Sequence, residues 1–504
     1  MSLSEVLKDR DRVILPISLF VLTVISRIPF TSKLLYHMDS AQFALALKNY
    51  NVTVHQPHPP GYFLYVMLGR LFNYFIRDAN TAFVSISIIF SGLTVVAIYY
   101  MGRELFDKKT AIIAGILALT SPNLWFHGEV AFSYAVEAFF SAIIAYLCWN
   151  VIKGREKFVW GLAIVFAVSG GIRQNTPVFL FPLWLYSMSR FPLRKIAISI
   201  GLFGVMSLSW FIPMILMTGG WDAYSSALEH LLQSTVSQGG VLKNGWSAFK
   251  FHSVVLFNFL IYGAGGGVVL LLFSIYHIIR NSRLAYLDKS KVSFFSLWML
   301  PSFFFFLLIA IHPAVSGHVL IFLPPLLLLT AKAITYSVDE LKKLTSRDMS
   351  ISIVLALVFI NLYIVFFSYY SVSYRMIKEH DKKFSEIRER LSSFDPSTTV
   401  IFSSQNYIYY GLTHIIYYLP EYLAYDPDVF SPGVKRWGGV NKNTFLANEV
   451  VLPEKIQSFV TLLYEDDISW NSMTKSNLSV QPISMKILPS IYIVSGSIGD
   501  VDKV

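Results

Sequence analysis

Long apolar runs, separated by short polar segments, occupy the first three quarters of the chain. A run of about twenty apolar residues can cross a bilayer as an α-helix, and about eleven runs reach or approach this length. They cover residues 13–30, 80–101, 110–126, 131–151, 158–171, a run that ends near 187, then 196–217, 253–279, 293–311, 319–335 and 350–370. The pattern predicts a polytopic α-helical membrane protein with about 11 transmembrane helices.

Lysine and arginine gather in every second connecting segment. These basic segments lie near residues 8–12, 103–109, 153–157, 190–195, 280–291 and 342–347. Cytoplasmic loops carry such an excess, so the N-terminus is predicted to be cytoplasmic and, after an odd number of spans, the C-terminus external. The first run lacks a small-residue cleavage site and is predicted to remain as a signal anchor in the cell membrane.

Two outer segments differ from simple connections. Residues 63–75 form an amphipathic stretch, predicted to lie along the outer interface with Arg70 and Arg77 turned to headgroups. Residues 218–252 are rich in glycine, serine and tryptophan and are predicted to form a long outer loop. Arg173 is also predicted on the outer side, where a positive charge needs a reason.

Composition supports the membrane class and excludes others. Of the 504 residues, 54% are hydrophobic and 14% are charged, against about 25% charged in soluble domains. The net charge of +10 does not indicate nucleic acid as a partner, because the basic residues lie in the short loops. The single cysteine, Cys148, excludes a disulfide framework within the chain.

The last quarter of the chain follows a different pattern, with charges of both signs and more serine, aspartate and proline. Residues 378–390 have helical charge spacing, whereas residues 398–402 and 487–494 are typical of strands. We therefore predict a membrane domain at residues 1–370 and a small external soluble α/β domain at residues 371–504.

The first outer loop holds a carboxylate and two histidines. Asp39 opens a segment of helical period, and His55 and His58 follow among three prolines. Each proline ring locks its own φ and restricts the residue before it, so the imidazoles are predicted to sit on a stiff loop. A rigid, solvated loop between two membrane helices is the simpler alternative.

Further polar residues at the predicted outer face come from four other loops or span ends. They are Glu129, Glu137, Arg173, Gln174, His312 and His318. Ionisable groups beside a membrane span are costly and are candidates for function. A carboxylate suits a general base or a metal ligand, and arginine and histidine suit a phosphate. The spacing is not a metal signature, so a divalent metal is not favoured and no metal ligand is assigned.

Each of these residues also has a structural explanation. Glu137, on an apolar helix, is the kind of residue that forms an interhelical hydrogen bond. Arg173 follows Gly170 and Gly171 and could cap a broken helix, or reach the headgroups with its long side chain. His312 and His318 are typical of interfacial turns.

Four stretches resemble the glycosyltransferase C superfold, with protein O-mannosyltransferase-like and aminoarabinose-transferase-like membrane enzymes as its nearest members. Asp39 and Ser40, followed by the sequence QPHPPGY at residues 56–62, resemble the first outer loop of that superfold. Residues 126–137 resemble the second outer loop. Residues 170–174 resemble a turn after the fifth span, and residues 317–325 resemble the late turn that meets the lipid phosphate.

The resemblance implies a glycosyltransferase that uses a polyprenyl-phosphate-linked monosaccharide, either a hexose or a pentose. The family's first-loop aspartate, here Asp39, serves as general base, and the sugar carbon is attacked with inversion. A protein, lipid or glycan hydroxyl would be the acceptor. Ser40 stands where many relatives carry a second acidic residue, and the C-terminal region matches no sugar-binding module. The predicted catalytic residues are Asp39 and Glu129, and the predicted substrate-binding residues are His55, His58, Tyr62, Arg173, Gln174 and His318.

Two other classes are open. A secondary transporter also has many spans and broken helices, but its sites lie near the bilayer midplane between paired repeats. Here the polar groups fall at one face, and no repeat is evident. An oligosaccharide ligase or oligosaccharyltransferase shares the lipid-phosphate chemistry but transfers a whole chain, and the second of these generally needs a metal. Chelator sensitivity and donor size separate these possibilities.

Overall fold

The computed structural model describes residues 10–272, 288–345, 349–369, 372–404, 407–426, 438–439, 458–462, 479–483 and 491–495. The chain forms two compact units. The first comprises Met1–Thr31 and Tyr62–Met376, and the second comprises Ser32–Gly61 and Ile377–Val504. The predicted division at residue 370 stays a prediction, because a unit defined by compactness is not a domain shown to fold alone. The first outer loop nevertheless belongs to the same unit as the C-terminal region.

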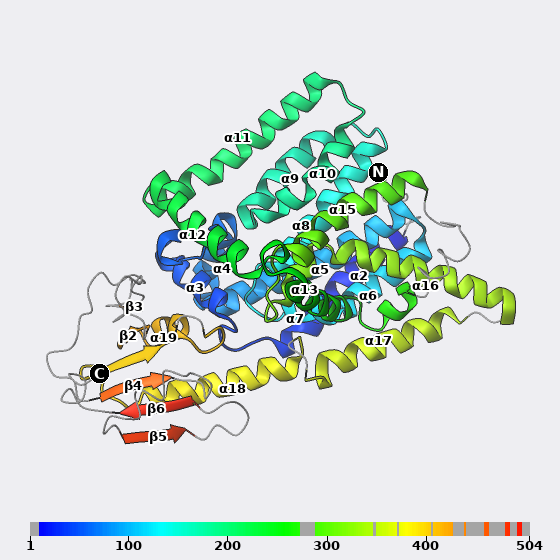
Figure 1. Ribbon diagram of the computed structural model, residues 1–504. Helices are drawn as coiled ribbons and strands as arrows, with labels where there is room; N and C mark the ends of the chain where they lie inside the picture. Colours follow the sequence, from blue (N-terminus) through cyan, green and yellow to red (C-terminus); the bar gives the residue numbers. More distant parts are fainter. Residues whose placement is uncertain are drawn as a thin grey trace. The chain divides into compact units, whose positions relative to one another are not determined.

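Every regular element in the described part of the first unit is a helix (Figure 1). The elements are α2 (Arg10–Arg27), η1 (Ile28–Phe30), α4 (Phe63–Ile76), α5 (Ala79–Leu105), α6 (Lys108–Thr120), α7 (Pro122–His127), α8 (Tyr134–Ile152), α9 (Phe158–Ile172), α10 (Asn175–Met188), α11 (Leu193–Thr218), α12 (Trp221–Gly239), α13 (Val241–Ala264), α15 (Lys289–Leu308), η3 (Ser316–Ile321), α16 (Leu323–Thr345) and α17 (Ser350–Phe367). Helix α18 (Tyr374–Leu391) begins here and continues into the second unit.

Helices α5 and α8 form the centre of the first unit. α5 packs against α2, α4, α6 and α8, and α8 also packs against α9 and α10. In the apolar stretch of α8, 83% of the residues are buried, compared with 11% in α11. α11 is therefore peripheral, and its exposed apolar side chains, such as Val205 and Leu216, suit a lipid-facing helix.

Capping side chains fix the points at which the helices begin. At the start of α5, Asp78 Oδ1 accepts a hydrogen bond from the Thr81 amide at 2.8 Å. At the start of α6, Asp107 Oδ1 accepts one from the Thr110 amide, also at 2.8 Å. Each cap satisfies an amide that the first helical turn leaves without a partner.

Six helices in the described residues are long and apolar enough to cross a membrane. They are Arg12–Phe30, Ala79–Leu105, Tyr134–Ile152, Leu193–Thr218, Lys289–Leu308 and Ser350–Phe367. The predicted count of eleven is not confirmed. Two of the other predicted spans correspond to the short helices α9 and α10, which are separated by a break at Arg173.

The structure agrees with the amphipathic stretch predicted at residues 63–75 but not with the loop predicted at residues 218–252. The amphipathic stretch is helix α4, which buries Tyr65 and Val66 and exposes Tyr74 and Phe75. The predicted loop at residues 218–252 is instead helical, with α12 followed by the first half of α13. The prediction was wrong because glycine and serine were taken as loop residues, whereas the glycines fall mainly at the helix ends.

The basic connecting segments contact one another, as expected of loops on one side of a membrane. Arg155 Nη1 lies 3.3 Å from Glu104 Oε2, which joins two of these segments. Lys195 Nζ lies 2.6 Å from Glu156 Oε2 and joins a third. These contacts agree with the predicted alternation of loops. Which side is cytoplasmic stays a prediction.

The second unit combines the first outer loop with the C-terminal region. The described elements are α3 (Met38–Lys48), η2 (Val52–Val54), most of α18, β1 (Thr399–Ser403), α19 (Leu412–Tyr418), β2 (Leu423–Tyr425), β3 (Gly438–Gly439), β4 (Ser458–Leu462), β5 (Ser479–Ile483) and β6 (Ile491–Ser495). One sheet has the order β3-β2-β1-β4, in which β1 pairs parallel with β2 and β4. The second sheet pairs β5 and β6 antiparallel.

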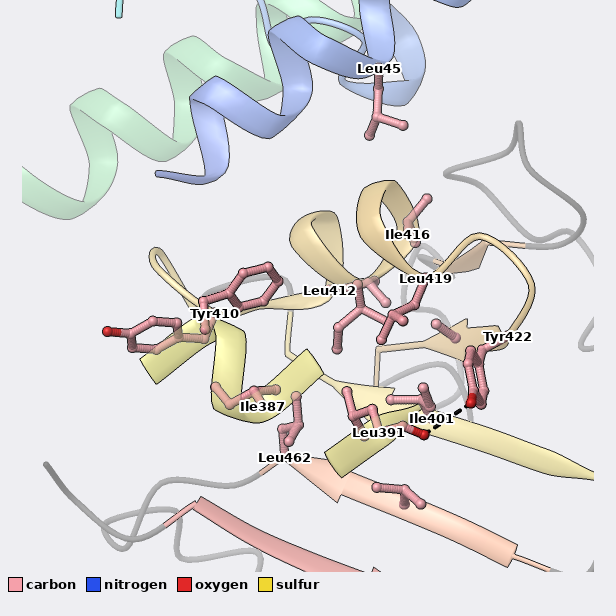
Figure 2. Close-up of a cluster of buried hydrophobic side chains, with 14 residues drawn as sticks. Leu45, Ile387, Leu391, Ile401, Tyr410, Leu412, Ile416, Leu419, Tyr422 and Leu462 are labelled. Carbon is pink, nitrogen blue, oxygen red and sulfur yellow. Dashed lines mark hydrogen bonds between the residues drawn. The ribbon is translucent and has the colours of Figure 1, made fainter. Parts of the chain in front are cut away.

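The core of this unit is shared between the outer loop and the C-terminal region. It gathers Ile387 of α18, Ile401 of β1 and Ile415 of α19 around one apolar cluster (Figure 2). Leu45 of α3 is 7% exposed and belongs to the same cluster. The helix that carries Asp39 is therefore packed in this core through its last turns. The predicted helix at 378–390 and strand at 398–402 correspond to α18 and β1. Of the predicted strand at 487–494, residues 491–494 belong to β6, and residues 487–490 lie outside the described residues.

Candidate functional site

Asp39 lies in the first turn of α3, as predicted. The residue that caps this helix is His37, whose Nδ1 accepts a hydrogen bond from the Asp39 amide at 3.1 Å. The Asp39 carboxylate is therefore not needed as a helix cap.

The Asp39 carboxylate lies between two imidazoles. Its Oδ1 is 3.6 Å from Nδ1 of His37 and 3.8 Å from Nδ1 of His58. Nδ1 of His58 lies 2.7 Å from Oε1 of Gln42, and because an amide oxygen accepts, this nitrogen donates. Gln42 stands one helical turn after Asp39 on α3, so the two side chains share a face of the helix.

The loop that carries the histidines is held by local contacts. Asn51 and Gln56 form a backbone bridge, and the peptide bonds before Pro57 and Pro60 are cis. His55 adopts a left-handed φ of 55° and ends the short helix η2. Tyr50 donates a hydrogen bond through Oη to the Gly61 carbonyl at 2.6 Å. The stiff loop predicted from the prolines thus brings His58 to the Asp39 carboxylate.

Arg173 lies in the first unit, at the break between α9 and α10. Its Nε is 3.1 Å from Glu137 Oε2, and its Nη1 donates to Ser133 Oγ at 2.9 Å. The guanidinium also lies over the Tyr134 ring at 4.1 Å and faces the Tyr62 ring at 5.3 Å. The predicted interhelical partner of Glu137 is therefore Arg173 itself, together with Thr176, whose Oγ1 donates to Glu137 Oε1 at 3.2 Å.

His318 approaches the same aromatic residue from a different segment. Its ring stacks on Phe306 with centroids 4.9 Å apart and meets Tyr134 at 6.1 Å. Gly317 makes this approach possible, because a Cβ at that position would lie 2.3 Å from atoms of the Tyr134 ring. Tyr134 thus lies next to both Arg173 and His318, although these two residues are 145 positions apart in the sequence.

Glu129 is completely buried. Its Oε1 accepts a hydrogen bond from Trp125 Nε1, and the Arg27 guanidinium lies 3.9 Å from the centre of the Trp125 ring. Arg27 Nη2 also donates to the Leu119 carbonyl at 2.6 Å. Full burial favours a role in joining the first span to the second outer loop. A catalytic role of Glu129 stays a prediction.

The remaining predicted residues occupy separate positions. Tyr62 is buried at the N-cap of α4, and Gln174 Nε2 lies 3.7 Å from the sulfur of Met214. His312 is exposed, and its Nδ1 accepts from the Ala314 amide, as in an ordinary turn. Among the described residues, no group of three His, Cys, Asp or Glu side chains is placed to hold a metal ion.

The sequence analysis did not single out several residues that contact the predicted site residues. Gln42 could have been found from its spacing of three residues from Asp39. Arg27 could have been found as a charge inside the first apolar run. Ser133 and Tyr134, which hold Arg173, were noted only as part of a resemblance and had no signal of their own.

Part of the chain matches a known family. Residues 39–194 match the family described as Protein O-mannosyl-transferase TMEM260 N-terminal domain. The matched segment begins at Asp39 and includes His58, Glu129 and Arg173, but ends before His318. Comparison with curated proteins gave no match.

The whole chain shares its fold with solved structures of ArnT from Cupriavidus metallidurans. The apo structure has 12% sequence identity and a TM-score of 0.58, and covers 96% of this chain and 97% of ArnT. The structure of ArnT bound to undecaprenyl phosphate has 11% identity, a TM-score of 0.59 and the same coverage. The predicted resemblance to the glycosyltransferase C superfold and to O-mannosyltransferase-like enzymes is therefore confirmed.

Proposed function

We propose that this chain is a membrane glycosyltransferase. It moves a monosaccharide from a polyprenyl-phosphate donor to an acceptor hydroxyl on the outer face of the membrane, with inversion. The observation that carries the proposal is the Asp39 carboxylate, which is 15% exposed and lies beside the imidazoles of His37 and His58. It is also the first residue of the segment that matches the O-mannosyl-transferase family.

Asp39 takes the acceptor's proton in the proposed step. The hydroxyl oxygen forms a bond to the anomeric carbon while the bond from that carbon to the phosphate oxygen breaks. The phosphate leaves with the bonding electron pair, and the hydroxyl proton moves to the Asp39 carboxylate. General-base assistance of this kind contributes typically about 10²–10⁴-fold to the rate. His58, held by Gln42, is proposed to orient the carboxylate or the acceptor.

Arg173 and His318 are proposed to bind the donor phosphate. Tyr62, whose ring lies 5.3 Å from the Arg173 guanidinium, and Gln174, the residue after Arg173, are proposed to contact the donor as well. The structure of ArnT with undecaprenyl phosphate supports a lipid-phosphate donor for this fold. Because Glu137 already pairs with Arg173, the pair carries little net charge. Arg173 would therefore act through N–H groups fixed in direction, which stabilise an anion without needing to reorient.

The proposed acceptor is a hydroxyl of a protein, lipid or glycan, and the proposed location is the cell membrane with the N-terminus cytoplasmic and the C-terminus external. The charge bias of the connecting segments supports this orientation. An acceptor that approaches from outside would meet the first outer loop, which belongs to the same unit as the external C-terminal region.

The test is transfer in vitro by the full chain in lipid nanodiscs. A panel of prenyl-phosphate monosaccharides is offered with candidate acceptors, and products are read by mass spectrometry. Asp39→Asn should lower kcat at least about 10²-fold, a barrier increase of roughly 2.7 kcal/mol, because the amide has the carboxylate's size but cannot take a proton at neutral pH. The donor KM should change little. Asp395→Asn, at an exposed turn, is the matched control and should keep full activity.

Two results would contradict the proposal in different ways. Transfer by Asp39→Asn at the wild-type rate would remove Asp39 as the base. Transfer only from a lipid-linked oligosaccharide, abolished by a chelator, would replace the monosaccharide transferase with an oligosaccharyltransferase.

A further inference from the structure

The segment that leads from the first span to Asp39 has no regular structure of its own. Residues Ser32–His37 are irregular, so their backbone amides and carbonyls need partners from elsewhere. We call residues 32–37 the connector. The described contacts show that its partners come from α18 and α19, more than 340 residues later in the chain.

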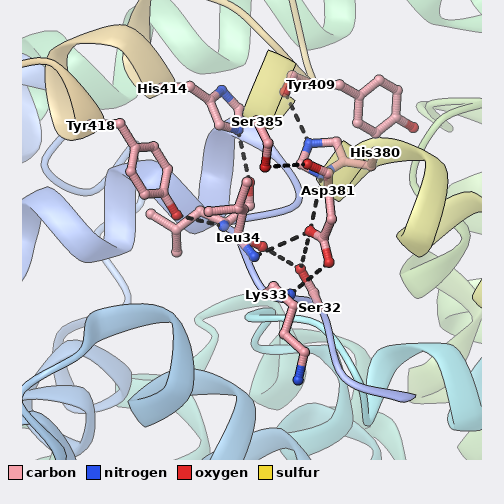
Figure 3. A network of polar contacts seen from close by, with 10 residues as sticks. Ser32, Lys33, Leu34, His380, Asp381, Ser385, Tyr409, His414 and Tyr418 are labelled. Atoms are coloured by element: carbon pink, nitrogen blue, oxygen red, sulfur yellow. Dashed lines mark hydrogen bonds and ion pairs between the residues drawn. The ribbon is translucent and has the colours of Figure 1, made fainter. Parts of the chain in front are cut away.

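Asp381 of α18 binds the beginning of the connector. Its Oδ2 accepts a hydrogen bond from the Lys33 amide at 2.7 Å, and its Oδ1 accepts one from the Leu34 amide at 3.1 Å. Ser32 Oγ lies 3.3 Å from the same Oδ1 (Figure 3). A carboxylate that accepts from backbone amides makes stronger hydrogen bonds than a neutral group.

Two side chains of α19 bind the middle of the connector. Tyr418 Oη accepts a hydrogen bond from the Leu35 amide at 2.8 Å. His414 Nε2 donates to the Leu35 carbonyl at 3.1 Å. Both backbone groups of Leu35 are thus paired with one short helix, which leaves this residue little freedom to move. Figure 3 shows the two side chains of α19, His414 and Tyr418.

The residues between Leu35 and Asp39 also contact the C-terminal region. The Tyr36 ring lies 4.8 Å from the His380 ring and 5.4 Å from the Tyr409 ring. The Met38 amide, one residue before Asp39, donates to the Ile408 carbonyl at 2.7 Å. The last contact fixes the start of α3, and hence the direction from which the Asp39 side chain leaves the backbone.

We propose that the C-terminal region positions the catalytic loop, with Asp381, His414 and Tyr418 as positioning residues for Asp39. This inference rests on the proposed role of Asp39 as base. Misplacement of a reacting group by about 1 Å can lower the rate about 10²-fold, so a fixed connector matters for turnover. The C-terminal region would thereby serve the chemistry without touching substrate.

Amide hydrogen exchange of the full chain tests the attachment without any assay of activity. In Asp381→Ala, the amides of Lys33 and Leu34 lose their acceptors, so exchange in residues 32–39 should rise at least about tenfold. Asp381→Asn keeps one acceptor oxygen and should give an intermediate rise. Asp395→Ala is the matched control, because Asp395 bonds only within its own turn, to Ser397.

Transfer kinetics test the catalytic consequence. Asp381→Ala should lower kcat about 10–100-fold with the donor KM unchanged within about twofold, because Asp381 is not one of the residues proposed to bind the donor. In the double variant Asp381→Ala, Asp39→Asn, the two reductions in kcat should not multiply. Once Asp39→Asn has removed the base, displacing that side chain should lower kcat no further. Asp381→Asn should restore part of the rate.

Each outcome has one meaning. Unchanged exchange in Asp381→Ala would overturn the inference, and so would a double variant whose losses multiply. If Asp39→Asn alone were fully active, the proposed function would fail, while the exchange measurement would still decide whether the C-terminal region holds the connector.

Discussion

Two carboxylates predicted at the outer face, Asp39 and Glu137, have opposite surroundings. Asp39 is 15% exposed and has imidazole nitrogens at 3.6 and 3.8 Å. Glu137 is 2% exposed and lies 3.1 Å from Nε of Arg173. Glu137 is buried and serves as the counter-charge of Arg173, whereas Asp39 is partly exposed beside imidazoles and can be reached by an acceptor hydroxyl. The comparison separates a residue suited to proton transfer from one suited to holding a cation in place.

The largest expected effect comes from breaking the buried pair. Arg173→Ala leaves Glu137 buried without its counter-charge, which should cost about 3–5 kcal/mol of unfolding free energy. The double variant Arg173→Met, Glu137→Gln removes both charges and should recover most of that loss. Unfolding in detergent, followed by tryptophan fluorescence, measures both. Arg190→Ala, at an exposed position, is the control.

The same experiment separates donor binding from folding. If donor phosphate needs Arg173, the double variant should be folded but bind donor weakly. If the double variant were as unstable as Arg173→Ala, the unpaired charge of Glu137 would not explain the loss of unfolding free energy.

A smaller loss of stability is expected when Gly317, which lies against the Tyr134 ring, is replaced by a larger residue. Gly317→Ala would place a Cβ 2.3 Å from atoms of the Tyr134 ring, so the ring must move and should disturb Arg173 and His318, which both contact it. Overpacking of this kind costs about 1–3 kcal/mol, and the donor KM should rise. Gly161→Ala is the matched control, because no atom lies within 4 Å of the added Cβ. Equal stability and KM in the two variants would mean that the close approach has no importance.

The smallest expected effect is a dependence of the stability of the second unit on pH. Burial, and then the nearby His380 and His37, hold the pKa of His414 well below its ordinary value of 6.5. Between the two pKa values the unfolded chain binds a proton that the folded chain does not. Stability is therefore complete above about pH 6.5 and falls as the pH decreases, by at most about 1.4 kcal/mol per pH unit.

Limited proteolysis at a series of pH values measures this dependence. Cleavage within residues 377–426 should accelerate below pH 6.5 in the wild type. His414→Gln keeps a donor for Leu35 but cannot be protonated, so its profile should be flatter. His312→Gln changes an exposed histidine and should leave the profile as it was. An unchanged profile in His414→Gln would assign the dependence to other groups.

Sequence patterns predicted the features that depend on neighbours in the chain. The helix that begins at Asp39, the break at Arg173 and strand β1 follow from local period, glycine and β-branched residues, and all three are present. The resemblance to the glycosyltransferase C superfold followed from short motifs and is confirmed.

Pairings across the sequence could not be predicted. Arg173 and Glu137 were both singled out, but neither pattern says that they share an ion pair between α8 and α9. Asp381 gave no signal, because a charged residue on an amphipathic helix is ordinary until its partner is known. The count of eleven spans is not confirmed, because an apolar run predicts a buried helix as readily as a membrane span, and short buried helices such as α9 fit both.

The connector and α3 belong to a unit whose other part is the C-terminal region. During synthesis, residues 32–61 therefore leave the ribosome about 315 residues before the first partner that holds them, Ile377 onward. The membrane helices can pack in the meantime, but Asp39 stays unplaced until translation of α18 and α19 is complete. If Asp39 is the base, as proposed, an unfinished chain has its membrane helices but no positioned base, and transfer would begin only after the last quarter of the chain is made.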